Sequence, residues 1–214
     1  MQTTRTRTRP TQRERSDGTI EALLQAARDL FADRGYHATS LDAVCDAAHV
    51  TKGALYHHFS SKQHLFRAVY EREQARLSRI VARAYRDAEA DSWEAVFAGA
   101  RAFLAEVLAS DVQRINLLDA PGALGMDTMR EISSDCLLMM QEGIRRAAAR
   151  GDIAPHSVPA LSHLLYGALC EAAMAAARAE DQQAALDASV TELRALFDAL
   201  AAAARPVSGA AVLG

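Results

Sequence analysis

The 214-residue sequence lacks the patterns that mark several common protein classes. Its three cysteines, Cys45, Cys136 and Cys170, are far apart, and no C-x-x-C pair occurs. An odd, dispersed set argues against a disulfide framework or a zinc knuckle and is typical of a reducing compartment. No apolar run approaches the roughly 20 residues that a membrane-spanning helix needs, and no apolar segment of a secretion signal follows the basic N-terminus. We therefore expect a cytoplasmic protein without a metal, a cofactor or a membrane partner.

Patterns typical of β-strands are missing as well. The sequence shows no sustained alternation of apolar and polar residues, and no Asn-Gly or Asp-Gly turn joins two alternating segments. Instead, apolar residues recur three and four positions apart in five long segments. These segments begin near Ile20, Trp93, Met129, Leu161 and Val190. We predict an all-α protein of about nine helices.

Charge is divided unevenly along the chain. Residues 1–86 hold 15 Lys and Arg against 9 Asp and Glu, a net charge of +6, whereas residues 87–214 hold 9 against 18, a net charge of −9. Such a split indicates a polyanion-binding module joined to a domain with another task. Chance clustering of surface charge is the alternative that composition leaves open.

The segment from residue 50 to residue 66 concentrates histidines, lysines and aromatic residues. Thr51 is placed to cap a short helix, because its hydroxyl can accept a hydrogen bond from an early backbone N–H. At about 100° per residue, Leu55 and Phe59 share the inward side of this helix. The outward positions are Lys52, Gly53, Tyr56 and His57.

A second short helix is predicted just upstream, with Thr39 or Ser40 as its cap. Two short helices joined by about three residues form a helix-turn-helix, whose second helix can enter the major groove of DNA. Downstream, Ser60 to Gln63 has the pattern of a capping box that opens a longer helix. Lys62 lies in the first turn of that helix, and a helix N-terminus beside a lysine is a favourable seat for a phosphate.

Over residues 18–70 the sequence resembles the N-terminal domain of the tetracycline-repressor (TetR) family of bacterial transcriptional regulators. The matching residues include Ala26-Ala27, Leu30-Phe31, Gly35-Tyr36, Thr39-Ser40, Val50 to Gly53, Leu55 to Phe59 and Ser61-Lys62. The resemblance implies one set of residues that mostly hold DNA phosphates, Thr39, Ser40, Tyr56 and Lys62. It implies a second set that lies in or against the groove, Thr51, Lys52, Gly53 and His57.

Two positions depart from the family pattern. His49 stands in the turn where the family usually has glycine, and Cys45 stands where it usually has alanine. Because histidine occupies a left-handed turn position only with some strain, we expect the turn to differ slightly. Cys45 is interpreted as a small buried residue.

Metal binding and catalysis are the alternatives for the histidines. His57 and His58 have no His, Cys, Asp or Glu three or four residues away to complete a chelating face. His57 also has no nearby Ser or Cys nucleophile and no orienting carboxylate, so we do not expect an enzyme. His58 and His64 are interpreted as solvated surface residues.

The resemblance, together with composition, divides the chain into four parts. Residues 1–15 form a disordered basic arm, residues 16–62 the DNA-binding domain, residues 63–205 a helical ligand-binding and dimerisation domain, and residues 206–214 a flexible tail. The arm carries Arg5, Arg7, Arg9, Arg13 and Arg15. Contact with the minor groove or phosphates, and a merely solubilising role, are both open.

The acidic part of the chain is where the family fold places a ligand pocket and a dimer interface. The helix predicted near residues 157–179 is apolar on two faces, one around Leu165 and one around Tyr166, so we expect it to be buried on both. Methionines concentrate over residues 126–140, and flexible thioethers suit an adaptable pocket, although they also simply fill cores. The predicted ligand-binding residues are Phe97, Phe103, Asn116, Met129, Arg130, Cys136, Met140, His163, Tyr166, Cys170 and Met174. A sensor role for Cys136 or Cys170 is less favoured than packing.

These observations together predict a homodimeric, ligand-responsive regulator of transcription. We expect a repressor that leaves a near-palindromic DNA operator when a small, largely apolar effector binds. The alternative is a helical ligand-binding or enzymatic protein with a vestigial DNA module. The sequence settles neither the effector nor the operator.

Overall fold

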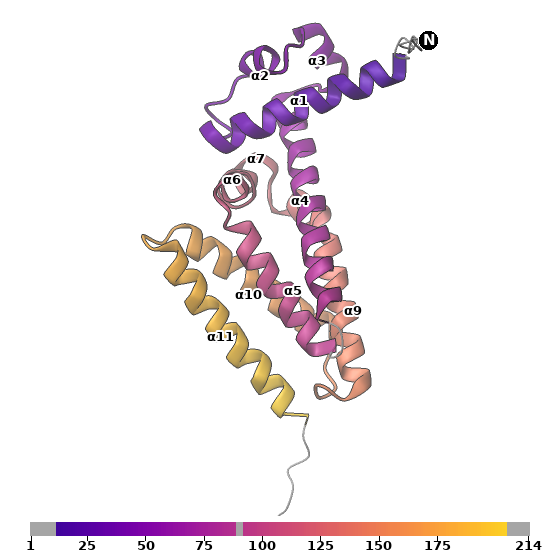
Figure 1. Ribbon diagram of the computed structural model, residues 1–214, viewed down its shortest axis with the longest axis vertical. Coiled ribbons are helices and arrows are strands. Elements are labelled where there is room, and N and C mark those ends of the chain that lie inside the picture. The colour runs from indigo at the N-terminus through magenta and orange to yellow at the C-terminus, as the bar shows by residue number, and fades with distance from the viewer. Residues whose placement is uncertain (1–11, 89–91, 205–214) are drawn as a thin grey trace, which may run out of the picture. The chain divides into compact units, whose positions relative to one another are not determined.

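The computed structural model describes residues 12–88 and 92–204, and its described residues form helices and connections without a strand (Figure 1). The chain divides into two compact units, unit 1 (Met1–Tyr70) and unit 2 (Glu71–Gly214). Helix α4 (Lys62–Asp87) runs through the division. The division falls eight residues after the expected end of the DNA-binding domain at residue 62, because the first turns of α4 bury apolar side chains in unit 1.

Unit 1 is built from α1 (Gln12–Arg34), α2 (Leu41–Ala48), α3 (Lys52–His58) and the start of α4. The apolar face predicted for the first helix is buried, with Leu23, Ala27 and Phe31 at 0% exposure. The ring of Phe31 meets the edge of Phe66 from α4 at 5.0 Å between centroids. Burial of this apolar surface is the main contribution that holds the four helices of unit 1 together.

The two predicted terminal segments fall largely outside the described residues. Residues 1–11 of the basic arm and residues 205–214 at the other end are not described. Residues 12–15, which the sequence analysis assigned to the arm, form the first turn of α1.

Unit 2 contains the rest of α4 and the helices that follow it. They are α5 (Ser92–Val107), α6 (Ser110–Gln113), the π-helix η1 (Arg114–Asp119), α7 (Ala120–Leu124), α8 (Met126–Ile132), α9 (Ser134–Arg150), α10 (Val158–Ala177) and α11 (Gln182–Ala202). Counting the uninterrupted run of α6, η1 and α7 as one segment gives ten helical segments in the described chain, close to the nine expected.

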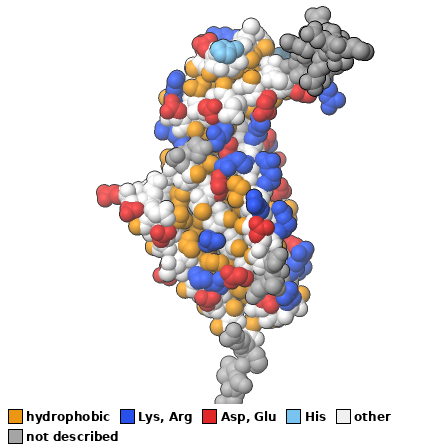
Figure 2. Space-filling view, in the orientation of Figure 1, with side chains coloured by type: hydrophobic (Ala, Val, Ile, Leu, Met, Phe, Trp, Pro, Cys, Tyr) orange, Lys and Arg blue, Asp and Glu red, His pale blue; other side chains and the backbone are white. Residues whose placement is uncertain are grey.

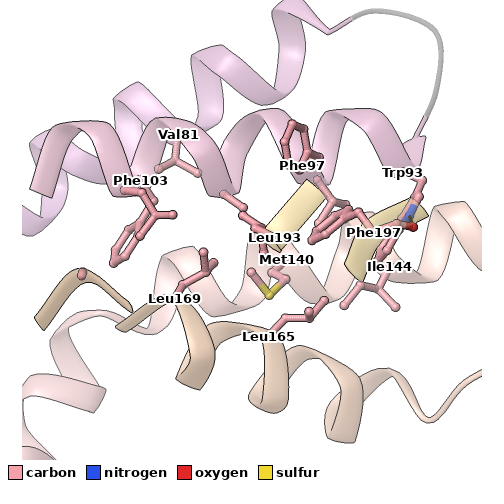
Figure 3. Close-up of a cluster of buried hydrophobic side chains, with 14 of the residues drawn as sticks. Val81, Trp93, Phe97, Phe103, Met140, Ile144, Leu165, Leu169, Leu193 and Phe197 are labelled. Atoms are coloured by element: carbon pink, nitrogen blue, oxygen red, sulfur yellow. Dashed lines mark hydrogen bonds between the residues drawn. The ribbon is translucent and has the colours of Figure 1, made fainter. Parts of the chain in front are cut away.

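The core of unit 2 joins α5, α9, α10 and α11 (Figure 3). The rings of Trp93 and Phe197 stack with centroids 4.3 Å apart, and the indole N–H of Trp93 donates to the carbonyl of Phe197 at 2.9 Å. The guanidinium of Arg194 lies 4.2 Å from the centroid of the Phe97 ring. The predicted ligand residue Phe97 is therefore enclosed by aromatic and cationic neighbours of its own chain.

No segment was expected to be long and apolar enough to cross a membrane, but helix α10 is one by length and composition. Its 20 residues reach a mean hydropathy of 1.3 over an 18-residue window. Leu165 and Leu169 are buried in the core, but Leu164 on the same helix is 71% exposed. A core helix of a soluble protein passes the same composition test, so this result is weak evidence for a membrane span.

Candidate nucleic-acid interface and ligand pocket

The turn between α2 and α3 is fixed by local hydrogen bonds. Ser40, one of the two predicted caps, accepts a bond from the backbone N–H of Ala43 at 3.1 Å. At the other end of α2, the N–H of His49 donates to the carbonyl of Asp46 at 3.2 Å and the N–H of Val50 donates to that of Cys45 at 3.0 Å. This pair of bonds is a Schellman motif, which requires a left-handed residue just past the helix.

His49 is that left-handed residue, with φ 53° and ψ 41°. Among the described residues it is the one non-glycine residue with positive φ. From sequence, strain and a slightly different turn were expected at this position. The histidine adopts the left-handed geometry that glycine would, so the expected strain is present and the turn keeps a regular form.

Helix α3 presents the two faces that its sequence predicts. Thr51 is its N-cap, accepting from the N–H of Ala54 at 3.2 Å. Leu55 and Phe59 are buried at 0% and 5% exposure, whereas Tyr56 is 56% exposed. A Cβ built on Gly53 would meet nothing within 4 Å. The outer side of α3 is thus open to a partner that approaches closely, although DNA contact itself stays a prediction.

Lys52 on this outer side is held by an acidic side chain of α2. Its Nζ lies 2.7 Å from Oδ1 of Asp42, and both side chains are more than half exposed. The hydrogen bond and the negative charge of Asp42 raise the pKa of Lys52, so this ammonium keeps its proton.

Two of the residues predicted to hold phosphates are bonded inside unit 1. Thr39 is 2% exposed, and its hydroxyl lies 2.8 Å from the carbonyl of Gly35. The ammonium of Lys62 donates to the carbonyls of Tyr36 at 2.8 Å and Thr39 at 3.1 Å, and it lies 4.4 Å from the centroid of the Tyr36 ring. Both side chains therefore tie down the connection between α1 and α2, which the sequence analysis did not anticipate.

The capping arrangement at the start of α4 is shifted by one residue from the prediction. Ser61, not Ser60, caps the helix by accepting from the N–H of His64 at 3.1 Å. The ring nitrogen Nδ1 of His64 accepts in turn from the N–H of Ser60 at 3.3 Å. His64 is exposed, as interpreted from sequence, and its ring accepts the backbone hydrogen bond from Ser60 that Gln63 was expected to accept.

Unit 2 contains an apolar pocket between four helices. It holds about 390 Å³ of empty space, part of which is open to solvent. It is lined by Val81 and Tyr85 of α4, Val96, Gly99, Ala100 and Phe103 of α5, Cys136, Met139 and Met140 of α9, and Tyr166 and Leu169 of α10. The cavity itself is only about 30 Å³, well below the roughly 300–1,000 Å³ usual for small-molecule sites.

The polar groups at this pocket are neutral. Its lining residues include no Asp, Glu, Lys, Arg or His. Burial raises the pKa of the Cys136 thiol and of the Tyr85 hydroxyl. Nearby in α10, burial raises the pKa of Cys170 to about 11. These thiols stay protonated at neutral pH, which disfavours the oxidant-sensor alternative for Cys136 and Cys170.

Four of the predicted ligand residues line this pocket. They are Phe103, Cys136, Met140 and Tyr166. Cys170 and Met174 pack half-buried against the core beside it. The contribution of α4, Val81 and Tyr85, was not predicted, because no apolar face was assigned from sequence to the second half of that helix.

The remaining predicted ligand residues lie elsewhere. Arg130 is exposed and pairs with Asp127, and Met129 lies half-buried on α8. His163 is exposed, with Nδ1 2.6 Å from the carbonyl of Pro159. Asn116 is 3% exposed in the π-helix η1, and neither atom of its side-chain amide has a hydrogen-bond partner among the described residues. Buried amides without partners are uncommon, and π-helices frequently occur at functional sites.

Both parts of the chain match known families. Residues 23–69 match the family described as bacterial regulatory proteins, tetR family. Residues 93–200 match the family described as tetracyclin repressor-like, C-terminal domain. The two matches correspond to the helix-turn-helix region and to the helices around the pocket.

Curated relatives resemble the N-terminal region. Over 62 residues the chain is 44% identical to the Transposon Tn10 TetC protein of Escherichia coli, covering 29% of this chain and 32% of that protein. Over 50 residues it is 54% identical to the HTH-type transcriptional activator FasR of Mycolicibacterium smegmatis, covering 23% of each. Other matched relatives are named as repressors. The chain thus matches these relatives over about a third of their length or less.

Solved structures are similar over most of the chain. A TetR-family transcriptional regulator from Pectobacterium atrosepticum is 36% identical, with a TM-score of 0.77. The similarity covers 89% of this chain and 97% of that one.

Proposed function

Because the chain belongs to the tetracycline-repressor (TetR) family of bacterial regulatory proteins, we propose that it is a homodimeric, effector-controlled regulator of transcription that acts in the cytoplasm. The observation that carries this proposal is the division of α3 into a buried side, Leu55 and Phe59, and an open side around Gly53 and Tyr56. An exposed helix of this kind, preceded by a fixed turn, is the arrangement by which helix-turn-helix proteins enter the major groove.

In this proposal the outer side of α3 reads base edges. His57 offers an imidazole to base edges, Tyr56 offers a hydroxyl to a phosphate, and Gly53 allows the helix backbone to come close to DNA. Ser40 has its hydroxyl at the N-terminus of α2, where a helix can meet a phosphate. The family relatives include both repressors and an activator, and we favour repression with release by the effector.

The second part of the proposal concerns the exposed apolar side of α10 and α11. Leu164 and Leu196 are 71% and 44% exposed, and Gly167, Ala168 and Ala188 beside them are small and exposed. A groove along α5, α10 and α11 is lined by residues that include Ala168, Ala188 and Leu196. In the view of Figure 2, acidic and basic side chains are interspersed among apolar ones.

A second copy of this chain fits this surface. Small residues let helices approach closely, and a two-fold axis would pair α10 and α11 with the same helices of the partner. The same pairing explains why α10 is apolar enough to resemble a membrane span without entering a membrane. Two-fold symmetry of the protein would in turn demand two similar half-sites in the operator.

The oligomeric state tests the interface directly. We expect wild-type protein to sediment as a dimer and Leu164→Arg to sediment as a monomer. Leu138→Arg is the matched control, because Leu138 of α9 is also an exposed leucine, at 58% exposure, but lies on another helix. A Leu164→Arg protein that is folded and still dimeric would refute this interface.

The third part of the proposal is the effector. The pocket of unit 2 offers thioethers, aromatic rings and hydroxyl or thiol groups but no charge. Burying an ion without a partner is costly, so a neutral, largely apolar molecule fits the pocket best. The effector acts only through its different affinity for the DNA-binding and the non-binding conformers.

DNA binding separates this proposal from a helical ligand-binding protein or enzyme with a vestigial module. We expect the full chain to retard DNA from its own promoter region in a sequence-specific manner. His57→Ala should weaken binding to this DNA more than binding to an unrelated duplex, because base contacts rather than phosphate contacts are lost. The absence of any specific retardation at low salt, with and without cell extract, would support the alternative.

A further inference from the structure

We propose that Asp42 lowers the affinity of unit 1 for DNA by competing with phosphates for the ammonium of Lys52. The proposal rests on the proposed function, because it assumes that the outer side of α3 meets DNA. It adds a residue that acts against binding and that belongs to neither predicted set of DNA contacts.

The geometry of the pair supports this role. Lys52 is the first residue of α3, at the end of the outer side, and its Nζ lies 2.7 Å from the carboxylate of Asp42. The carboxylate comes from the first turn of α2. In helix-turn-helix complexes the first helix crosses the DNA backbone while the second enters the groove. An acidic side chain at the N-terminus of α2 thus lies where phosphates are expected.

The pair is easily exchanged for a phosphate contact. The side chains of Lys52 and Asp42 are 62% and 63% exposed, so water screens their attraction. A DNA phosphate is an anion of the same kind as the carboxylate and can take its place. Lys52 must break its ion pair with Asp42 before it can hold a phosphate, and this loss lowers the affinity for DNA without regard to base sequence.

The second lysine of unit 1 does not compensate for this loss. The ammonium of Lys62 already donates to the carbonyls of Tyr36 and Thr39. The two lysines near the predicted interface therefore both have partners inside unit 1. Contacts to phosphates supply most non-specific affinity, so holding both ammonium groups inside unit 1 lowers the general attraction to DNA that these two lysines can provide.

The test compares charge removal at two positions of α2. Asp42→Asn removes the partner of Lys52 while keeping the size of the side chain. Asp46→Asn removes the same charge one helical turn further along, where the side chain is exposed. Binding of the full-length proteins to a duplex of unrelated sequence, about 30 bp long, is followed by fluorescence anisotropy between about 50 and 200 mM salt.

One additional phosphate contact steepens the plot of the logarithm of the binding constant against the logarithm of the salt concentration by about 0.9. At about 0.1 M salt this corresponds to a binding constant up to about eightfold higher. We expect Asp42→Asn to approach this gain for each recognition helix that meets DNA, and Asp46→Asn to change the slope much less. In a Lys52→Gln background, Asp42→Asn should no longer steepen the slope.

Two results would overturn the proposal. Equal gains for Asp42→Asn and Asp46→Asn would show a general effect of charge, and a gain that persists in Lys52→Gln would show that Asp42 does not act through this lysine. Failure of the proposed function looks different, because the wild-type protein would then bind neither its promoter DNA nor the unrelated duplex at about 50 mM salt. Circular dichroism of each variant checks that it is folded.

Discussion

Replacing Lys62 by methionine separates two roles that one lysine can have at the start of α4. The resemblance to the family implies that Lys62 holds a DNA phosphate. The structure instead shows its ammonium bonded to carbonyls of the connection between α1 and α2. Methionine keeps an unbranched apolar side chain of similar length and removes the charge. The variant therefore tests the ammonium rather than the packing of the stem.

The expected loss of stability follows from the bonds that disappear. The ammonium donates to Tyr36 at 2.8 Å, to Thr39 at 3.1 Å and, more weakly, to His37 at 3.4 Å. A hydrogen bond from a charged group contributes about 1.5–3 kcal/mol. Ordering a lysine side chain costs up to about 2 kcal/mol of conformational entropy. Replacing it by methionine returns only part of this cost, because a buried methionine also loses rotamer freedom. We therefore expect the free energy of unfolding to fall by about 2 kcal/mol, and the carbonyls of Tyr36 and Thr39 to be left to water.

Urea unfolding followed by circular dichroism measures this change. Arg83→Met is the matched control, since Arg83 is also a cation of α4 but is 80% exposed and pairs with Asp87 four residues away. Such a pair contributes about 0.5 kcal/mol or less. DNA affinity of Lys62→Met should fall without a change in its salt dependence. An unchanged free energy of unfolding, together with a salt slope reduced by about 0.9, would instead establish the phosphate contact and refute our argument.

Three further changes probe single features of the fold, each by urea unfolding. His49→Gly should raise the free energy of unfolding by about 0.5–1 kcal/mol, because glycine adopts the left-handed position without strain. A lower free energy of unfolding would contradict this account of the turn. Gly143→Ala should lower it by about 1–3 kcal/mol, because the new Cβ would lie 2.4 Å from Cγ2 of Val96, whereas Gly18→Ala, with open space, should not. Burial raises the pKa of Cys170 from 9.0 to about 11. The free energy of unfolding should therefore fall as the pH rises through that range, because the folded state favours the protonated thiol. In Cys170→Ala, the free energy of unfolding should depend less on pH in the same range.

The sequence predicted features that depend on neighbours along one helix. The inward position of Leu55 and Phe59 follows from the spacing of a helix, and the caps of Ser40 and Thr51 follow from side chains that reach three residues ahead. The strain at His49 was also predictable, because a helix end of this type needs a left-handed residue. These are local effects, and local chemistry decides them.

The sequence could not predict contacts between distant segments. Lys62 bonds to carbonyls 23 and 26 residues earlier, and Lys52 meets Asp42 across the turn. Neither pairing leaves a periodic signal. The same limit applies to the pocket, which Phe103 and Tyr166 line but Phe97 does not. Only the placement of α11 shows that Phe97 packs against Phe197, with ring centroids 5.4 Å apart.

The internal bonding of both lysines bears on how an effector can control this protein. If phosphate contacts are few, operator affinity depends mainly on the fit of α3 in the groove and less on general attraction to DNA. A conformer in which α3 fits poorly then loses most of its affinity, because little sequence-independent binding remains to retain it. The effector needs only a modest difference in affinity between the two conformers when operator occupancy is near its midpoint. Asp42→Asn should therefore do more than tighten binding: by adding phosphate contacts to both conformers, it should make release by the effector less complete at the same protein concentration.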